Sequence, residues 1–194
     1  ANGSNFIRSY DLETGKELWR LGGSSKITAP TPVFADGLIV VASGRAPERP
    51  IFAVREGASG DLTLNDGDRK NEFVAWSHVK RGPYMPTPLI YRGKVHILNN
   101  GGIFACYDLK SGTELSRRRI PHRAFGFSAS PVATNGRIYL PGEDGVVFEM
   151  KAGDDPNLVA VHELGEPLMA TPALSAGVMY LRGQKHLFAV GKKK

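Results

Sequence analysis

The side chains that could carry out chemistry are scattered through this sequence rather than grouped at the spacings that catalysis or metal binding requires. The histidines occur singly, never at H-x-H or H-E-x-x-H spacing; they are His78, His96, His122, His162 and His186. His96 occupies an alternating position of an apolar segment, which is more typical of a packed histidine than of a metal ligand. No G-x-S-x-G segment occurs that would present a nucleophilic serine. The residues therefore predict no catalytic group and no metal site.

Three short segments are similar to parts of known sites without completing them. The glycine-rich segment 21–25 lacks the Lys-Ser/Thr that ends a phosphate-binding loop. The acidic stretch 65–68 would put leucines at the first and third ligand positions of a calcium loop. Glu143 and Asp144 precede a glycine and fit a turn between two strands. We interpret all three segments as turns or solvated loops.

A single cysteine, Cys106, excludes an internal disulfide and a thiolate zinc cluster. Its apolar neighbours predict a buried and inert thiol. The net charge of +6 is a modest excess, and the basic run 117–119, expected between two strands, lacks the interleaved aromatic residues that stack bases. We expect no nucleic-acid partner. The apolar stretches are far shorter than the roughly 18 residues that span a bilayer, so no transmembrane segment is predicted.

An internal repeat determines how these residues are positioned. Four segments align without gaps, namely TPVFADGLIVV, TPLIYRGKVHI, SPVATNGRIYL and TPALSAGVMYL, which begin at residues 31, 87, 130 and 171. In each, Ser or Thr precedes a proline, a glycine follows five residues later, and a β-branched or aromatic run comes next. The prolines are Pro32, Pro88, Pro131 and Pro172. Each proline can open a strand, each glycine suits a tight hairpin with positive φ, and a second strand follows.

The period of the repeat predicts the architecture. Successive prolines are 56, 43 and 41 residues apart. A unit of about 41 to 43 residues with four short strands is typical of one blade of a β-propeller. We therefore predict an all-β protein with four-stranded antiparallel blades, about four in number, whose repeats start near residues 29, 85, 128 and 169 of a single domain spanning 1–194. The polar segment 56–72 lengthens the first period and is expected to be a solvated turn. A β-sandwich, the structural alternative, would not explain four identical proline-to-glycine offsets.

The segment SYDLETGKELW, from residue 9, resembles the repeat of the pyrroloquinoline-quinone-type propellers, whose motif is roughly A-x-D-x-x-T-G-x-x-x-W. Its motif residues are Asp11, Gly15 and Trp19. A degraded second copy begins at Cys106 and ends at Ser116, and Trp76 lies in another expected fourth strand. The resemblance implies that the Asp and Gly shape a turn while the Trp packs between neighbouring blades.

The resemblance also implies two classes of function. Quinone-dependent alcohol dehydrogenases of this family have an adjacent Cys-Cys pair, which a chain with one cysteine cannot form, and their calcium ligands cannot be placed here. Relatives without catalytic activity include the propeller lipoprotein of the outer-membrane assembly machinery and uncharacterised exported bacterial proteins, which this chain resembles most. We therefore expect no cofactor and a periplasmic or extracellular location. The alternative is a quinone- and calcium-dependent dehydrogenase module that is complete only with further blades.

The two ends of the chain carry incomplete blades. The chain opens with third and fourth strands, near residues 5–10 and 16–21, and ends with a first, second and third strand. We expect the N-terminal strands 5–21 to complete the last blade by closure, because 16–21 can supply its fourth strand. Alternatively, two chains exchange this strand and form a homodimeric eight-bladed ring, or the chain is half of a longer propeller. A half-propeller origin is favoured, because the strand at 5–10 lacks its own first two strands.

The candidate binding surface is the loop face formed before each first strand and between each second and third strand. Basic residues outnumber acidic ones there, which would suit an acidic protein segment, a polysaccharide or a phosphate-bearing partner. A solvated loop face without a ligand is the alternative. The candidate residues are Lys26, Arg45, Arg49, Arg81, Tyr84, His122, Arg123, Phe125, Arg182 and Lys185. The sequence thus predicts a non-catalytic scaffold that binds a protein or glycan partner.

Overall fold

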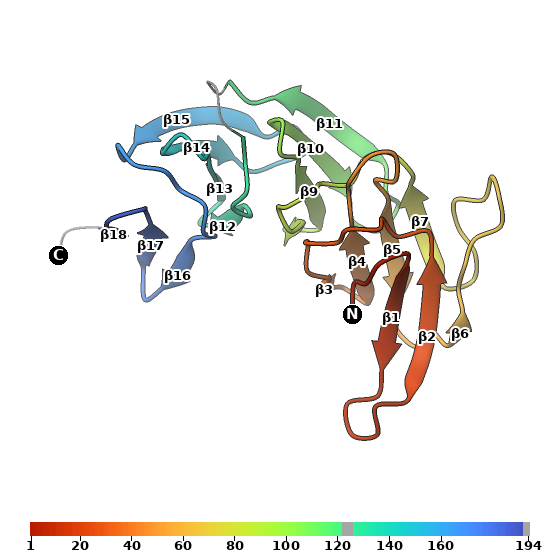
Figure 1. Cartoon of the computed structure of the whole chain (residues 1–194). Helices are drawn as coiled ribbons and strands as arrows, with labels where there is room; N and C mark the ends of the chain where they lie inside the picture. The colour runs from red at the N-terminus through yellow and green to blue at the C-terminus, as the bar shows by residue number, and fades with distance from the viewer. Residues whose placement is uncertain (122–125, 192–194) are drawn as a thin grey trace.

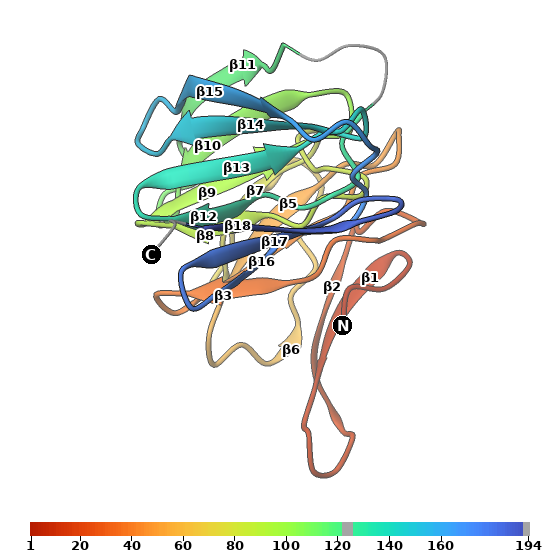
Figure 2. The ribbon, with the colours of Figure 1, turned by 90° about the vertical axis from the view of Figure 1, so that its left-hand side faces the viewer.

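The computed structural model describes residues 1–121 and 126–191, and its short antiparallel sheets follow one another along an open arc (Figure 1). In each four-stranded sheet, the first strand lies on the inner side of the arc and the fourth on the outer side. Figure 2 shows the sheets stacked as layers, with the N-terminal hairpin projecting at one end. No helix in the part of the chain that is described is long and apolar enough to cross a membrane.

Three sheets are complete four-stranded blades. Blade A consists of β3 (Val33–Ala35), β4 (Leu38–Ala42), β5 (Ile51–Arg55) and β7 (Val74–His78). Blade B consists of β8 (Leu89–Tyr91), β9 (Lys94–Leu98), β10 (Ile103–Asp108) and β11 (Glu114–Arg119). Blade C consists of β12 (Val132–Thr134), β13 (Arg137–Pro141), β14 (Val146–Lys151) and β15 (Asn157–Glu163). The three-stranded blade D consists of β16 (Ala173–Ser175), β17 (Val178–Arg182) and β18 (Leu187–Gly191). Each blade begins directly after one of the four prolines of the repeat, and blade D has three strands among the described residues where four were predicted.

The predicted hairpins between first and second strands form with the expected backbone. Asp36, Arg92, Asn135 and Ala176 have φ between 48° and 52°, and each is followed by a glycine with φ between 71° and 78°. Positive φ at both central residues defines the type I′ turn, whose twist matches that of the flanking strands. The glycine of the repeat is therefore required by the turn, whereas the residue before it varies.

A chain of hydroxyl groups links the inner strands of successive blades. The amide of Thr31 donates to Thr87 Oγ1 at 3.1 Å, and the amide of Thr87 donates to Ser130 Oγ at 2.9 Å. The amide of Ser130 donates in turn to Thr171 Oγ1 at 3.0 Å. This explains the Ser or Thr before Pro88, Pro131 and Pro172: in each of these three cases its hydroxyl satisfies an amide that precedes the adjacent blade.

Replacing Ser130 with alanine is expected to lower the free energy of unfolding by about 1 kcal/mol, because the amide of Thr87 then loses its acceptor. Urea unfolding measures the change. Ser130→Thr keeps the hydroxyl, so its free energy of unfolding should stay close to that of the wild type. Ser175→Ala, at an exposed serine of blade D, is the matched control. An equal effect of Ser130→Ala and Ser175→Ala would show that the hydroxyl chain does not stabilise the arc.

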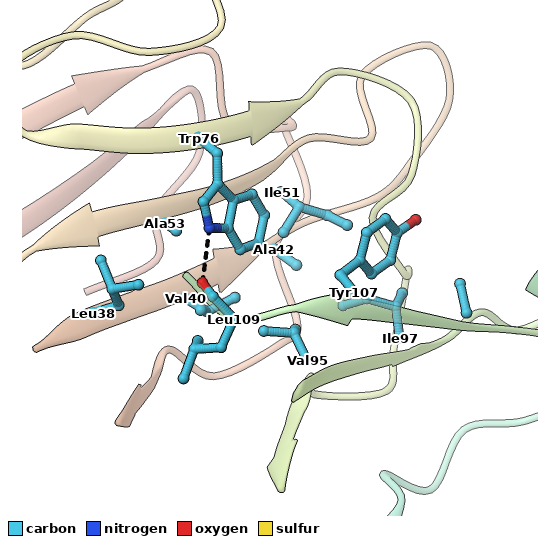
Figure 3. Packing of buried hydrophobic residues seen from close by; sticks show 11 residues of the cluster. Leu38, Val40, Ala42, Ile51, Ala53, Trp76, Val95, Ile97, Tyr107 and Leu109 are labelled. Atoms are coloured by element: carbon cyan, nitrogen blue, oxygen red, sulfur yellow. Dashed lines mark hydrogen bonds between the residues drawn. The ribbon is translucent and has the colours of Figure 1, made fainter. Parts of the chain in front are cut away.

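Apolar side chains fill the space between neighbouring blades. The largest cluster joins Leu38, Val40 and Trp76 of blade A to Val95 and Leu109 of blade B (Figure 3). Trp76 donates a hydrogen bond from its indole nitrogen to the Leu109 carbonyl at 2.9 Å. Trp19 is similarly buried, between the N-terminal sheet and blade A. Packing of the tryptophans between neighbouring sheets, which the resemblance implied, is present at both positions.

The segment 56–72 is more than the solvated turn that we expected. Its short strand β6 (Gly60–Asp61) pairs in parallel with β2 (Glu17–Gly22). Leu62 is 1% exposed and packs in the cluster that contains Trp19. The Thr63 hydroxyl accepts a hydrogen bond from the amide of Gly22 at 2.9 Å. The insertion therefore covers one edge of the N-terminal sheet, and a few apolar residues within a polar segment are enough to anchor it.

The closure expected within one chain is not formed. β2 pairs with β1 (Phe6–Tyr10) on one side and with β6 on the other. Blade D remains three-stranded in the part of the chain that the structure describes, and the two ends of the arc lie apart (Figure 1). The physical reason is that both edges of β2 are already occupied. Exchange of β2 between two copies, the other expectation, would require it to leave both neighbours.

Candidate functional site

Three loops beside blade A interlock and bring basic residues together. They are loop 23–32 before β3, loop 43–50 between β4 and β5, and loop 79–88 between β7 and β8. The amides of Arg81 and Gly82 both donate to the Arg49 carbonyl at 2.8 Å. The Arg45 amide lies 3.3 Å from the Ser25 hydroxyl, its acceptor. These bonds hold residues from three segments of the chain in one surface.

Two glycines permit the close approach of these loops. A Cβ atom on Gly82 would overlap the carbonyl oxygens of Ser43 and Pro50, and one on Gly44 would overlap those of Gly82 and Pro83. Neither glycine has a positive φ, so the requirement is space rather than backbone conformation. The backbone atoms of loops 43–50 and 79–88 are therefore in direct contact, which fixes the surface that they carry.

We call Lys26, Arg45, Arg49 and Lys80 the basic cluster. Lys26, Arg45 and Lys80 are exposed, whereas Arg49 is half-buried and its backbone is bridged to that of Lys80. Within residues 1–121 and 126–191, none of the four side chains forms an ion pair. Glu48 is the one acidic residue in the sequence of the three loops. The surface therefore presents a net positive charge.

Arg81 and Tyr84 are in the same loop system but contribute less to this charge. The Arg81 guanidinium turns toward blade B, where its Nε lies 3.4 Å from Glu114 Oε2. Tyr84 is half-buried in loop 79–88. Sequence reasoning placed both on the same face as the basic cluster, and the structure brings their backbone there. The sequence alone could not show that Arg81 is already paired with Glu114, an acidic residue of blade B.

The remaining predicted residues do not join the basic cluster. Arg182 and Lys185 are exposed on blade D, at the other end of the arc (Figure 1). The carboxylate of Glu166 shapes that loop by accepting bonds from the Lys185 amide and, at 2.7 Å, from His186 Nδ1. These bonds lower the pKa of Glu166. His122, Arg123 and Phe125 lie outside the described residues.

The arginine run 117–119 was expected between two strands and instead ends the outer strand β11. Arg117 binds Glu114, and this interaction lowers the pKa of that carboxyl to about 2. Arg118 pairs with Asp155 of blade C, and Arg119 donates to the Gly101 carbonyl at 2.7 Å. All three guanidinium groups therefore have partners within the protein. This run does not add free positive charge to the surface.

A cavity of about 720 Å³ lies between blades C and D. Its walls include Tyr139, Glu149 and His162 of blade C and the apolar Met179 and Val190 of blade D. Glu149 is paired at 3.0 Å with both Arg137 and His162. Burial raises the pKa of Tyr139. The cavity thus contains a carboxylate whose charge is already balanced within the blade.

His96 and Cys106 are both buried, as the sequence predicted. His96 is 1% exposed and stacks on Phe104, with 5.7 Å between the ring centroids. Burial raises the pKa of the Cys106 thiol to about 11, so the thiolate is not available at neutral pH. Over the described ranges, no group of three or more His, Cys, Asp or Glu side chains is arranged to hold a metal ion.

Glu143, part of a predicted turn, connects two loops through hydrogen bonds. Its carboxylate accepts a hydrogen bond from the Ser128 hydroxyl and lies 3.3 Å from the amide of Gly126. It therefore joins the loop between β13 and β14 to the loop that precedes β12. Glu143 and Asp144 thus lie in a turn between two strands, as the sequence predicted.

The comparisons with known proteins support the fold and leave the function open. No protein-family model and no curated protein matches the chain. Among solved structures, BamB from Moraxella catarrhalis is 18% identical with a TM-score of 0.68, and the aligned region covers 97% of this chain and 53% of BamB. The computationally designed Ika8 protein is 14% identical with a TM-score of 0.68 and the same two coverages. The designed Ika4 protein is 12% identical with a TM-score of 0.66, with coverage of 92% of this chain and 99% of Ika4.

These similarities confirm the β-propeller fold with about four blades. At identities below 20% they carry no information about ligands or reactions. The chain spans about half the length of BamB and of Ika8, and nearly the whole of Ika4. It therefore corresponds to half of two of these propellers.

Proposed function

We propose that the protein is a non-catalytic propeller scaffold that binds an anionic partner through the basic cluster. The observation that carries this proposal is the set of four cations, Lys26, Arg45, Arg49 and Lys80, that lie on interlocked loops without ion-pair partners among the described residues. By contrast, Arg117 and Arg118 of β11 are paired with carboxylates of the protein itself. Carboxylates of an acidic protein segment or of an acidic glycan are the groups that this surface can bind.

The rigidity of the three loops supports binding rather than simple solvation. Ordering a flexible loop on binding costs free energy for its backbone, in addition to about 0.5–1.5 kcal/mol for each immobilised side chain. Here the backbone contacts at Gly44 and Gly82 already fix the loops. The exposed charges can also attract an anionic partner from a distance, which increases the association rate and makes it dependent on salt. A periplasmic or extracellular location, where acidic surfaces and glycans are present, is part of this proposal.

The test is a charge reversal with a matched control. The cluster variant carries Arg45→Glu, Arg49→Glu and Lys80→Glu. The control carries Arg55→Glu, Lys110→Glu and Lys151→Glu, which change the net charge equally at exposed residues outside the three loops. Binding of poly-L-glutamate and of polygalacturonate is measured at about 50 mM salt, below physiological ionic strength.

We expect the cluster variant to weaken binding of at least one probe by more than about tenfold, equivalent to about 1.4 kcal/mol. The control should change binding by less than about threefold, since its charges are distributed over other parts of the surface. The probe that binds more tightly identifies the partner as protein or glycan. Equal losses in both variants would mean that only the net charge matters, and the proposal would then be wrong.

A further inference from the structure

The outer strand of blade C, β15, combines an unpaired edge with exposed apolar side chains. Its seven residues read NLVAVHE, so its only carboxylate, that of Glu163, lies at the very end of the strand. Leu158, Val159 and Val161 are 38%, 47% and 48% exposed. β15 pairs with β14 on one side, and no strand of the described residues pairs with its other side.

The outer strands of the other sheets are covered or charged. β2 is covered by β6 of the insertion 56–72. The same insertion reaches β7, where the Ser77 hydroxyl donates to the Arg69 carbonyl at 2.9 Å. β11 carries three successive arginines, 117–119. Cover and charge are two of the means by which proteins prevent an edge strand from pairing with another chain, and within the described part of the chain β15 has neither.

The exposure of β15 is a property of blade C itself. β15 is the fourth strand of a complete blade, lies on the outer side of the arc, and has blade B on one side and blade D on the other (Figure 1). Leu158 and Val161 lie opposite Met150 and Phe148, which belong to the cluster between blades B and C. Because opposed residues of paired strands share a face, both side chains lie on the blade B side of the sheet. The three-stranded state of blade D therefore does not expose them.

The apolar residues of β15 are arranged so that the strand can pair with a second copy of itself. Antiparallel pairing about a two-fold axis at Ala160 places Val159 of each copy opposite Val161 of the other, and Leu158 opposite His162. This register pairs all seven residues of the strand. Opposed β-branched side chains stabilise a strand pair, and here two such pairs flank the axis.

The charges of β15 are also compatible with this pairing. Asn157 of each copy lies opposite Glu163 of the other, and an asparagine amide can donate a hydrogen bond to a carboxylate. No two like charges oppose one another, which would destabilise the pair. Asp154 and Asp155, which precede the strand, are each paired with a cation of blade B. The acidic residues next to the strand are therefore already neutralised within each copy.

We propose that β15 is a self-association surface: two copies of the chain pair their β15 strands antiparallel about a two-fold axis at Ala160, which joins the two copies of blade C into one sheet. A two-fold dimer uses the same surface of both copies, so the self-complementarity of β15 favours a second copy over an unrelated strand. No strand is exchanged, in contrast to the dimer considered from the sequence. The basic cluster lies beside blade A, and the dimer does not depend on the function proposed for that cluster.

The first experiment measures the mass of the full chain by sedimentation equilibrium. One strand pair is a small interface, so we expect a dissociation constant of about 1–100 μM. Over that range of concentration the mass should rise from 21.0 kDa toward about 42 kDa, twice the mass of the chain. A constant mass of one chain up to about 1 mM would overturn the proposal.

Charged variants locate the interface. The lysine variant carries Val159→Lys and Val161→Lys, which places lysines opposite one another in both flanking pairs. We expect it to dimerise at least about tenfold more weakly, with a change in melting temperature below about 2 °C because both residues are exposed. The control carries Phe34→Lys and Leu174→Lys, two exposed apolar residues of inner strands, and should dimerise as the wild type does. Equal behaviour of the two variants would overturn the proposal.

A mixing experiment keeps the test independent of any general effect of the lysines. A glutamate variant, with Val159→Glu and Val161→Glu, should also fail to dimerise alone. Mixed with the lysine variant, it should form a one-to-one dimer, because each lysine then lies opposite a glutamate. If the two variants stay monomeric when mixed, the two strands do not lie against each other and the proposal is wrong.

A disulfide tests the position of the two-fold axis. Opposed residues of antiparallel strands have Cα atoms about 4.5–5.5 Å apart, which a disulfide can span. Ala160→Cys should therefore form a linked dimer under oxidised glutathione, visible on a non-reducing gel. Ser175→Cys, at an exposed residue of blade D, is the control, and the native Cys106 is 0% exposed. Linkage of Ala160→Cys no faster than that of Ser175→Cys would contradict the register.

Discussion

Replacing Trp76 with alanine is expected to lower the free energy of unfolding by about 4 kcal/mol, within the range of about 3–5 kcal/mol for deletion of a large buried aromatic side chain. Trp76 is 6% exposed and lies in the cluster that joins blades A and B. The substitution opens a cavity between the blades and removes the only donor to the Leu109 carbonyl that the structure shows in its described part. Urea unfolding followed by circular dichroism measures the loss.

Two further variants separate packing from hydrogen bonding at Trp76. Trp76→Phe keeps an aromatic ring but removes the donor, so we expect an intermediate loss of about 2 kcal/mol. Phe34→Ala truncates an aromatic residue that is 60% exposed and should change stability by less than about 0.5 kcal/mol. If Trp76→Ala lowered the free energy of unfolding no more than Phe34→Ala does, the indole would not be what stabilises the contact between blades A and B.

The sequence predicted those features of the fold that depend on local geometry. A tight hairpin needs positive φ at two adjacent residues, and the glycines of the repeat, such as Gly136, therefore predict where each hairpin turns. The function of the preceding Ser or Thr could not be predicted in this way. The Ser130 hydroxyl binds an amide that is 43 residues away in the chain, and that partner is known only once the blades are stacked.

The sequence predicted which basic residues lie in the loops of the candidate site, but not which of them form ion pairs. Basic residues could be assigned to loops, yet whether each is free depends on acids that approach from other blades. Arg81 meets Glu114, whereas Arg45 and Lys80 meet no carboxylate in the described residues. Burial of Leu62 has the same origin: the polar segment 56–72 contains a few apolar residues, among them Leu62 and Leu64, that pack in an apolar cluster with other sheets. Contacts between distant segments therefore account for these two differences between expectation and structure.

Acidification is expected to destabilise the protein through His96. Burial, with a smaller contribution from the charge of Lys94, lowers the pKa of His96 from 6.5 to about 4. Neither ring nitrogen has a hydrogen-bond partner among the described residues. The folded state therefore keeps the ring neutral, while the unfolded state takes up a proton as the pH falls below about 6.5. Stability contributed by the neutral ring is complete above pH 6.5 and is lost progressively down to about pH 4, by about 3 kcal/mol in total.

Urea unfolding at pH values between 7.5 and 4.0 measures this loss, and His96→Leu provides the control. Leucine is apolar and close in size, and the equivalent position of blade A is occupied by Val40. We expect the variant to match or exceed the wild type at pH 4.5 and to show a smaller decrease in stability between pH 6.5 and 4. Carboxylates titrate equally in both proteins, so the difference between the two pH profiles isolates His96. Parallel profiles would mean that the folded protein accommodates the imidazolium, by admitting water or by separating blades B and C, and that this interface is less tightly closed than the burial of His96 indicates.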